Sequence, residues 1–440
     1  MIKIAPGNHN LQYIHILNED EKKHVDSGPV ATSVVIKESI DLYGTRAVIT
    51  VADQNDVLGK LPILGHERVV LAWSTDIKPG IKGKTSENPE IDPEPRVEVF
   101  RITNINAVTP DNDEVPGLKY AISLVSEFAY LQEFHNVDQA FSNTVSNCLK
   151  TIHNKVLKEP LGEIKIEDPK VFELVKVDDT DNVVDFIAPS DTPFTIIQML
   201  QSWAFNTTYP SSAYYYFQNK DGFNFRVIDS MAKDESGPEK KFYYGPDGQT
   251  SLGKNFELNR INNFVVHNRG NAFELASEGR LRNQVAEIDF IKKNVTLSEY
   301  SYEDYVSKYN IFGSKVFAGK KFMSSIGSIP TETHWVFKDG SRRENNLAQA
   351  LKHKWAMYKL IYNNVLSIVV PGSSNLTAGD VLDINIPQQI TVTDKKEIPL
   401  DNFLSGKYIA KDVDHVFNSE GYTIQINLIR TGSKLQTNEI

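Results

Sequence analysis

The sequence predicts a mainly β fold with α+β inserts. Three observations carry this prediction: apolar and polar residues alternate near both ends of the chain, turn-forming residues separate these runs, and helical periodicity is confined to the middle. A chain of 440 residues is longer than the roughly 250–300 residues that a single hydrophobic core supports. Its composition, 40% hydrophobic and 24% charged, is typical of folded chains. We therefore expect several domains.

The first strands are predicted within residues 32–53. Period-two alternation marks two half-buried strands there, broken at Leu42-Tyr43-Gly44-Thr45, with inward positions at Val34, Ile36, Ala47, Ile49 and Val51. A third strand follows at 68–73. Residues 74–96 are rich in proline, glycine and charge, which favours a long exposed loop. Strands resume at 97–107 and 118–126, joined by a turn through Pro110-Asp111-Asn112.

The middle of the chain predicts a mixed helical block. One helical face collects Phe141, Val145, Cys148, Leu149, Ile152 and Val156, with Asn136 or Asp138 as the expected N-cap. Ser190-Asp191-Thr192-Pro193 opens a second helix, which buries Ile196, Ile197, Leu200 and Trp203. Residues 214–218 and 224–228 form a predicted hairpin that closes near Asp221-Gly222. Residues 234–250 are predicted to be a linker.

The last third of the sequence returns to strand patterns. Strands are predicted at 256–266 and 284–292, followed by a tyrosine-rich insertion at 300–338 and a helix at about 346–362. The remaining segments alternate as plain β-strands, at 365–370, 381–386, 407–417 and 422–430, with Ser419-Glu420-Gly421 as the last turn.

Two hairpins at opposite ends of the chain resemble each other. In 101–126 and 408–429, Ile105 or Val413 is followed by Val108 or Val416, then by a polar turn and a strand that opens with Tyr120 or Tyr422. A short apolar strand and a proline-bearing loop precede each hairpin. We therefore expect an internal duplication of a β-domain.

Charge and composition exclude several classes of protein. With 47 basic and 57 acidic residues, the net charge of −10 argues against a protein that grips nucleic-acid phosphates. No apolar run approaches about 18 residues, so we expect no membrane insertion, and the first ten residues do not resemble a secretory signal. The single cysteine excludes an intramolecular disulfide and suits a reducing compartment.

The motifs of known catalytic sites are missing. Gly83-Lys84-Thr85 has Lys78 where a phosphate-binding loop needs glycine, and the histidines never form the H-E-x-x-H pattern of zinc proteases. The pairs Asp111/Asp113 and Asp179/Asp181 lack the remaining ligands of a calcium loop, and Cys148 lies on an apolar face. The acidic run Glu90, Asp92 and Glu94 is expected to be solvated. We assign no catalytic, cofactor-binding or metal residue.

Tyrosines form the one positive cluster. The aromatic rings are Tyr214–Tyr216, Tyr243, Tyr244, Tyr300, Tyr302, Tyr305, Tyr309 and Phe312. Packing in the core of an insert domain, a surface for a protein partner and a carbohydrate platform are all compatible with this cluster.

The two ends of the chain resemble the central baseplate hub protein of T-even-type contractile-tailed bacteriophages. Near the N-terminus the resemblance rests on TSVVIKESIDLYGTRAVITVAD, in which Ile40-Asp41-Leu42-Tyr43-Gly44 stands at the family's motif, and on the strand at 68–73. Near the C-terminus it rests on the turn Asn375-Leu376-Thr377-Ala378-Gly379 and on the strand with Tyr408, Val413 and His415. The loop at 74–96 and the insertion at 300–338 depart from the family.

The resemblance implies two similar tube-type β-barrel domains plus a mixed helical and hairpin insert domain. The first barrel would occupy 1–134, the mixed α/β insert 135–250, and the second barrel would be split between 251–295 and 361–440. The tyrosine-rich insertion and the long helix would occupy 296–360.

The resemblance also implies a structural role without catalytic activity. Three copies would form a homotrimer with pseudo-sixfold symmetry, because each copy supplies two barrels. This ring would join a trimeric tail spike protein to the hexameric tail tube protein, contact other baseplate proteins, and let DNA pass without specific binding. The protein would be assembled in the host bacterial cytoplasm and reside in the virion tail baseplate.

Two functions of other classes compete with this interpretation. A carbohydrate- or cell-surface-binding β-protein would use the tyrosine-rich insert, and a hydrolase would use a dispersed site.

Gly44 and Gly379 provide a structural prediction: a β-branched residue should disturb the fold if these glycines adopt positive φ.

Overall fold

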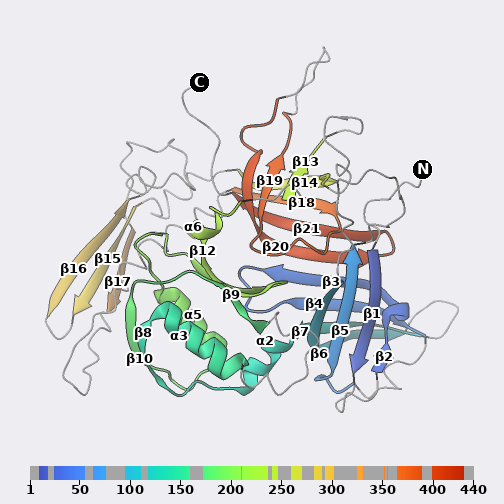
Figure 1. The fold of residues 1–440 in the computed structure, drawn as a ribbon, viewed down its shortest axis with the longest axis horizontal. Helices are drawn as coiled ribbons and strands as arrows, with labels where there is room; N and C mark the ends of the chain where they lie inside the picture. The colour runs from blue at the N-terminus through green and yellow to red at the C-terminus, as the bar shows by residue number, and fades with distance from the viewer. Residues whose placement is uncertain are drawn as a thin grey trace, which may run out of the picture.

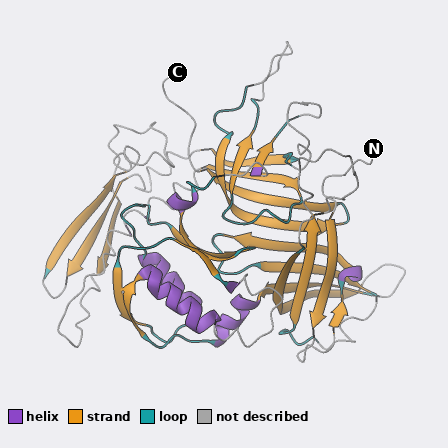
Figure 2. Cartoon of the chain, viewed as in Figure 1, coloured by secondary structure: helices purple, strands orange, loops and turns teal. Residues whose placement is uncertain are grey.

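The fold is mainly β with small helical inserts, as the sequence predicts (Figures 1 and 2). The structure is a computed structural model. It describes residues 9–17, 24–54, 63–75, 95–110, 117–158, 172–209, 211–235, 240–245, 259–269, 282–289, 293–301, 325–330, 351, 354, 364–388 and 399–430.

A large sheet contains strands from both ends of the chain. Its first half has the strand order β3-β4-β7-β6-β5-β1-β2. These strands are β1 (His9–Leu17), β2 (His24–Asp26), β3 (Ala31–Ser39), β4 (Arg46–Asp53), β5 (Arg68–Thr75), β6 (Arg96–Pro110) and β7 (Leu118–Ser126). The sequence patterns predict all of them except β1 and β2.

The second half of the sheet repeats this arrangement. Its strand order is β14-β18-β21-β20-β19-β13, which matches β3-β4-β7-β6-β5-β1 position by position. The strands are β13 (Lys241–Tyr243), β14 (Asn263–Arg269), β18 (Asn364–Pro371), β19 (Val381–Asn385), β20 (Gly406–Asn418) and β21 (Gly421–Arg430). One difference is that β13 runs parallel to β19, whereas β1 runs antiparallel to β5.

The register of the two hairpins confirms the internal duplication. The β6–β7 ladder skips one residue of β6 between Ile102 and Asn104, and the β20–β21 ladder skips one residue of β20 between Ala410 and Asp412. When these bulges are matched, Ile105 corresponds to Val413, as the sequence predicts.

The expected match of Tyr120 with Tyr422 is wrong by two residues. Ile105 pairs with Ile122, and Val413 pairs with Ile426, so Tyr120 corresponds to Ile424. The mismatch arises because β6 carries an extra residue between Asn106 and Thr109, which shifts the end of the first hairpin relative to the second.

Each half closes on itself through the segment that precedes its first strand. In the first half, the Ser27 N–H donates to the Ile14 carbonyl of β1 over 2.9 Å. In the second half, the Ile261 N–H donates to the Tyr243 carbonyl of β13 over 2.8 Å, and the Tyr243 N–H donates to the Asn259 carbonyl. These bonds join the segment before the first strand of each half to β1 in the first half and to β13 in the second, and we refer to the two halves as the first and second barrel.

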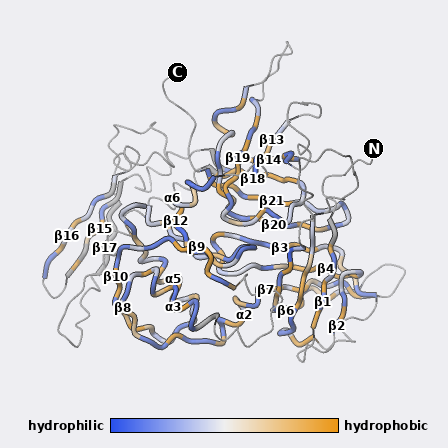
Figure 3. The backbone as a smooth tube through the Cα atoms, viewed as in Figure 1, coloured by the Kyte–Doolittle hydropathy of each residue, from blue (hydrophilic) through white to orange (hydrophobic). Residues whose placement is uncertain are grey.

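The two barrels share one sheet and one core. Strand β3 pairs antiparallel with β20 from Ser39 opposite Asp412 to Val34 opposite Phe417. Apolar residues alternate along the strands, which Figure 3 shows as changes of colour along each one. The buried positions include Val34, Ile36, Ile49, Val51, Ile122, Leu124, Ile368, Val413, Ile424, Ile426 and Leu428.

The mixed insert packs two helices between two small sheets (Figure 2). One sheet pairs β8 (Ala140–Thr144) with β10 (Val183–Ile187), and the other has the order β11-β12-β9. The latter contains β9 (Leu174–Val177), β11 (Tyr214–Asn219) and β12 (Gly222–Val227). The predicted hairpin is confirmed, and its turn is Lys220-Asp221, because Gly222 already pairs with Asn219.

The first helix of the insert begins later than expected. It is α3 (Val145–Ile152), capped by Thr144, whose side chain accepts the Asn147 N–H. Phe141 lies in β8 because residues 140–144 pair with β10, so the predicted caps Asn136 and Asp138 are wrong. The second helix, α5 (Pro193–Trp203), begins at Pro193, as predicted, and Thr192 is its N-cap.

A separate three-stranded sheet has the order β16-β15-β17. It comprises β15 (Arg282–Asp289), β16 (Asn294–Ser301) and β17 (Ser325–Pro330), and Figure 1 shows it beyond the insert. Residues 282–289 were expected within the second barrel, but they pair only within this sheet among the described residues. Similarly, the expected linker at 234–250 contains β13, which pairs with β19.

Several expected elements fall largely outside the described residues. These are the loop at 74–96 between β5 and β6, the turn after Pro110, most of the insertion at 300–338, and the helix at 346–362. Within the described part of the chain, no helix combines the length and apolarity needed to cross a bilayer.

Candidate functional site

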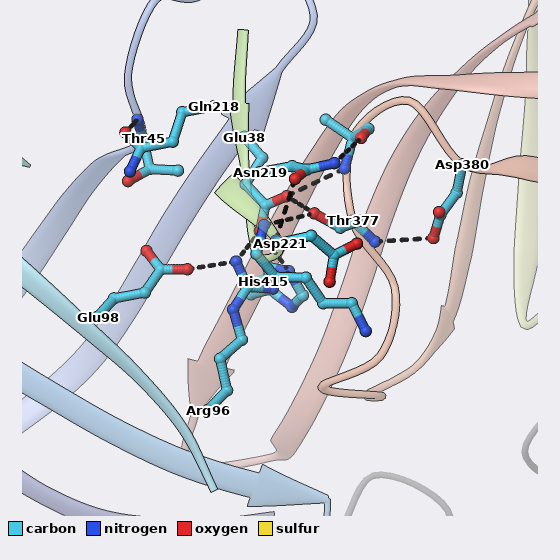
Figure 4. Close-up of polar contacts among 12 residues, drawn as sticks. Glu38, Thr45, Arg96, Glu98, Gln218, Asn219, Asp221, Thr377, Asp380 and His415 are labelled. Atoms are coloured by element: carbon cyan, nitrogen blue, oxygen red, sulfur yellow. Dashed lines mark hydrogen bonds and ion pairs between the residues drawn. The ribbon is translucent and has the colours of Figure 1, made fainter. Parts of the chain in front are cut away.

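The junction between the two barrels contains a buried cluster of charged residues (Figure 4). Arg96 of β6 binds two carboxylates, Glu38 of β3 and Glu98 of β6, through ion pairs. All three side chains are buried. They point inward because Glu38 continues the inward alternation of Val34 and Ile36, whereas Arg96 and Glu98 precede Phe100 and Ile102 in the alternation of β6.

The second barrel completes the coordination of Glu38. One carboxylate oxygen accepts the Thr377 hydroxyl and the Ala378 N–H, the latter over 3.0 Å. The other oxygen lies 3.4 Å from Nε2 of His415 on β20. His415 Nδ1 lies 2.6 Å from the Tyr422 hydroxyl of β21. Glu38 of the first barrel is therefore held largely by groups of the second.

These contacts set the protonation states. Burial alone would raise the pKa of Glu38, but Arg96, His415 and Thr377 outweigh it and hold this pKa well below its usual range. Burial and the nearby Glu38 raise the pKa of Glu98 despite the attraction of Arg96. Burial also lowers the pKa of His415. The cluster is thus a tight Glu38–Arg96 ion pair with a second carboxylate, Glu98, whose charged form is disfavoured by burial and by Glu38.

The insert is anchored to the same junction by the tip of its β11–β12 hairpin. The Thr45 N–H, just before β4, donates to Gln218 Oε1 over 3.4 Å. Asn219 Nδ2 donates to the Ala378 carbonyl over 3.2 Å, and the Lys220 N–H donates to the Thr377 hydroxyl over 3.1 Å. Thr377 therefore contacts both the insert and the charged cluster.

The turn that carries Thr377 depends on Gly379. Gly379 has a φ of +85°, and a Cβ atom there would lie 2.8 Å from the Phe217 ring of β11. The prediction of positive φ is confirmed at this position. It is not confirmed at Gly44, whose φ is not positive; a Cβ atom at Gly44 would instead meet the side chains of Ser126 and Ala129 at 2.5 and 2.7 Å.

A second buried ion cluster fixes the start of the insert. Glu127, the first residue of α2 (Glu127–Leu131), is fully buried and binds Arg68 of β5 over 3.0 Å and Arg101 of β6 over 2.6 Å. Arg101 also donates to the His66 carbonyl over 2.8 Å. These ion pairs tie the chain leaving the first barrel to the barrel wall.

Part of the tyrosine cluster lies in the core of the insert, and part of it lies outside the described residues. Tyr214, Tyr215 and Tyr216 are buried, so the core interpretation is right for them, and Tyr216 binds His153 Nδ1 over 2.8 Å. Tyr244 packs against Phe264 of the second barrel. Tyr302, Tyr305, Tyr309 and Phe312 fall outside the described residues.

Cys148 and Asp181, two other residues singled out by the sequence, have structural roles. Cys148 is buried, and burial raises the pKa of its thiol to about 11. Asp181 accepts the Thr207 N–H and hydroxyl, as a turn residue does. Asp111, Asp113, Glu90, Asp92 and Glu94 lie outside the described ranges. Across the residues that are described, no group of three His, Cys, Asp or Glu could hold a metal ion.

Sequence reasoning missed the charged cluster at the junction. The available signal was the presence of Glu38 and of Arg96 with Glu98 at inward positions of alternating strands. The partner strands could not be named, because 58 residues separate Glu38 from Arg96 and 319 separate Arg96 from His415.

No protein-family model matches the sequence, and no curated protein matches it. Solved structures do share its fold. The tail protein from Neisseria meningitidis MC58 superposes with a TM-score of 0.52 at 8% identity, over 96% of this chain and 97% of that one. The 43 kDa tail protein of prophage MuSo2 from Shewanella oneidensis gives 0.52 at 10% identity, over 95% and 98%. The chain therefore shares the fold of these two tail proteins.

Proposed function

We propose that this chain is a structural subunit of a phage tail baseplate, acting as the hub of a contractile tail. Three copies form a homotrimeric ring with pseudo-sixfold symmetry. The ring adapts a trimeric tail spike protein to the hexameric tail tube protein and contacts other baseplate proteins. It works in the virion tail after assembly in the host bacterial cytoplasm, and it has no catalytic role.

The repeated strand order within one chain is the observation that supports this proposal. Each barrel has the same order of six strands, and the β3–β20 ladder joins the two. Three chains with two such barrels present six similar units, which is what a threefold ring needs in order to contact a sixfold tube equivalently.

The buried junction supports a rigid rather than a hinged pair of barrels. Glu38, Arg96 and His415 bring three strands of the two barrels together, and the insert hairpin binds the same turn. A change in the angle between the barrels would leave buried charges without partners, which is strongly unfavourable. A fixed angle suits a ring whose two barrels must occupy successive sixfold positions.

The charge supports passage of DNA without specific binding. Three copies at −10 each give a total charge of −30, which does not favour retention of phosphates in a lumen. A lumen lined mainly by lysine and arginine would contradict this part of the proposal.

The alternative of a carbohydrate- or cell-surface-binding protein receives no support from the described tyrosines. A sugar platform needs exposed rings, whereas Tyr214, Tyr215 and Tyr216 are buried in the insert. The tyrosine-rich insertion at 300–338, on which this alternative depends, lies largely outside the described residues.

The stoichiometry and symmetry of the assembly test the proposal. The full chain, alone and co-expressed with its cognate tail spike protein, is examined by light scattering and by class averages of electron micrographs. We expect a mass of three times 49.6 kDa for the hub and averages with six similar lobes. A chain that stays monomeric in both preparations, or a ring of another number, would contradict it, as would glycan binding by the monomer.

A further inference from the structure

Two strand edges at opposite sides of the body have no partner among the described residues. Strand β6 pairs with β5 only from Arg96 to Arg101, and its continuation toward Pro110 pairs on one side, with β7. Strand β14 pairs with β18 alone. Figure 1 shows β14 on one side of the β3–β20 ladder and β6 on the other, so they cannot meet within one chain.

Each of these edges corresponds to an edge that is already used inside the chain. The counterpart of β6 in the second barrel is β20, and beyond its bulge β20 pairs with β3. The counterpart of β14 in the first barrel is that same strand β3. Because β14 corresponds to β3 and β6 corresponds to β20, the β3–β20 ladder within the chain shows how β14 and β6 would pair.

We infer that β6 of one copy pairs antiparallel with β14 of a second copy of this chain. The inference rests on the proposed ring and names the surface through which its copies join. In the internal ladder, Val413 lies opposite Glu38 and Asp414 lies opposite Lys37. The equivalent pairs are Ile105 opposite Arg269 and Asn106 opposite Asn268, when the bulge of β14 at His267 is allowed for.

Two exposed valines support a second copy as the partner. Val35 and Val416 face each other across the internal ladder and are half-buried there. The counterpart of Val35 is Val265, which is 49% exposed, and Val108 lies within one residue of the position that corresponds to Val416 and is 50% exposed. A ladder between β6 and β14 would cover both.

Ring closure follows from the alternation of the two ladders. An open strand edge with apolar side chains is an aggregation hazard unless another strand covers it. Each chain carries one β6 edge and one β14 edge, which are different surfaces, so the contact is head-to-tail and closes when the rotation per copy fits. Three internal ladders and three between copies then alternate around six barrels.

Disulfide trapping tests the pairing directly. In a Cys148→Ala background, Val108→Cys and Val265→Cys are combined in the full chain and oxidised mildly at increasing concentration. We expect covalent dimers and trimers on denaturing gels. The matched control combines Val108→Cys with Val295→Cys, because Val295 is a similarly exposed strand valine, at 56%, in the separate β16. The control should remain largely monomeric.

A charge substitution provides an independent readout. Val265→Glu should shift assembly to at least about tenfold higher concentration, whereas Val295→Glu should leave it unchanged, and neither should alter the melting temperature of the monomer. If light scattering shows trimers but no disulfide forms between copies and Val265→Glu has no effect on assembly, this pairing is wrong, whereas the proposed trimeric ring still holds. Absence of any oligomer would overturn both.

Discussion

The two barrels share a register but differ in what they bury at equivalent positions. Matched through their bulges, Arg96 and Glu98 of the first barrel correspond to Leu404 and Gly406 before and at the start of β20. His415 of the second barrel corresponds to the neighbourhood of Ala107 in β6. The charged cluster therefore exists only where the two barrels meet.

This difference separates two physical tasks. The apolar positions of the barrel core are apolar in both barrels of the chain: Phe100 corresponds to Tyr408, and Ile122 corresponds to Ile426. The charged positions occur where one barrel must be set against the other. Buried ion pairs contribute little net stability compared with apolar residues, but a wrong arrangement of them costs a great deal. The cluster thus specifies an orientation more than it strengthens a fold.

The largest expected effect comes from making the first barrel like the second at Arg96. Arg96→Leu leaves Glu38 and Glu98 buried without a cation, so we expect a loss of about 3–5 kcal/mol in the free energy of unfolding. Denaturant titration followed by circular dichroism measures it. Arg46→Leu on β4 is the matched control, because Arg46 is exposed.

A rescue distinguishes charge imbalance from lost packing. Adding Glu38→Gln and Glu98→Gln to Arg96→Leu removes the uncompensated charges and should recover part of the stability. A single Arg96→Leu variant as stable as the unmodified chain would show that the cluster does not hold the junction.

A smaller effect is expected from the turns that precede β5 and β19. Each contains a glycine with positive φ, Gly65 at +100° and Gly379 at +85°. A Cβ atom at Gly65 meets nothing within 4 Å, whereas one at Gly379 meets the Phe217 ring. Gly65→Val should cost about 1 kcal/mol from backbone strain alone, and Gly379→Val should cost about 1–2 kcal/mol more from the clash.

The difference between the two glycine variants reports on the insert. Thermal unfolding of both variants measures it, and limited proteolysis of the β11–β12 hairpin should increase only for Gly379→Val. Equal destabilisation by the two variants would mean that the insert is not anchored through this turn.

Much of the fold was accessible from the sequence because period-two alternation survives wherever one face of a strand is buried. The strands from β3 to β7 and from β18 to β21 were predicted in this way, as was the duplication. Strand β13 was missed because its three residues follow a segment rich in glycine, proline and charge, and its pairing with β19 comes from tertiary contacts. The late start of α3 was missed because Phe141 fits both a helical face and a strand.

The candidate site was largely inaccessible for a different reason. Its members come from β3, β6, β20 and the turn before β19, so the cluster exists only after the two barrels have been paired. A sequence pattern marks Glu38 as an inward charge but does not identify its partner. The tyrosines show the converse limit, since composition could not distinguish the buried rings of β11 from a binding surface.

The smallest effect concerns the second carboxylate, and it has the opposite sign. The folded-state pKa of Glu98 is raised above its ordinary value of 4.5 by burial and by Glu38, so its ionisation opposes folding. Glu98→Gln should therefore increase the free energy of unfolding at pH 7, by about 1 kcal/mol. This gain should vanish as the pH falls below 4.5, because the native carboxyl is then protonated in both states. Melting temperatures of both proteins across pH 4–8 measure the trend, with the exposed Glu420→Gln as control. A Glu98→Gln variant that is less stable than the unmodified protein at pH 7 would contradict this prediction. It would mean that Arg96 needs both carboxylates, so that Arg96, Glu38 and Glu98 act as one unit that the second barrel, with Leu404 and Gly406 at the equivalent positions, lacks.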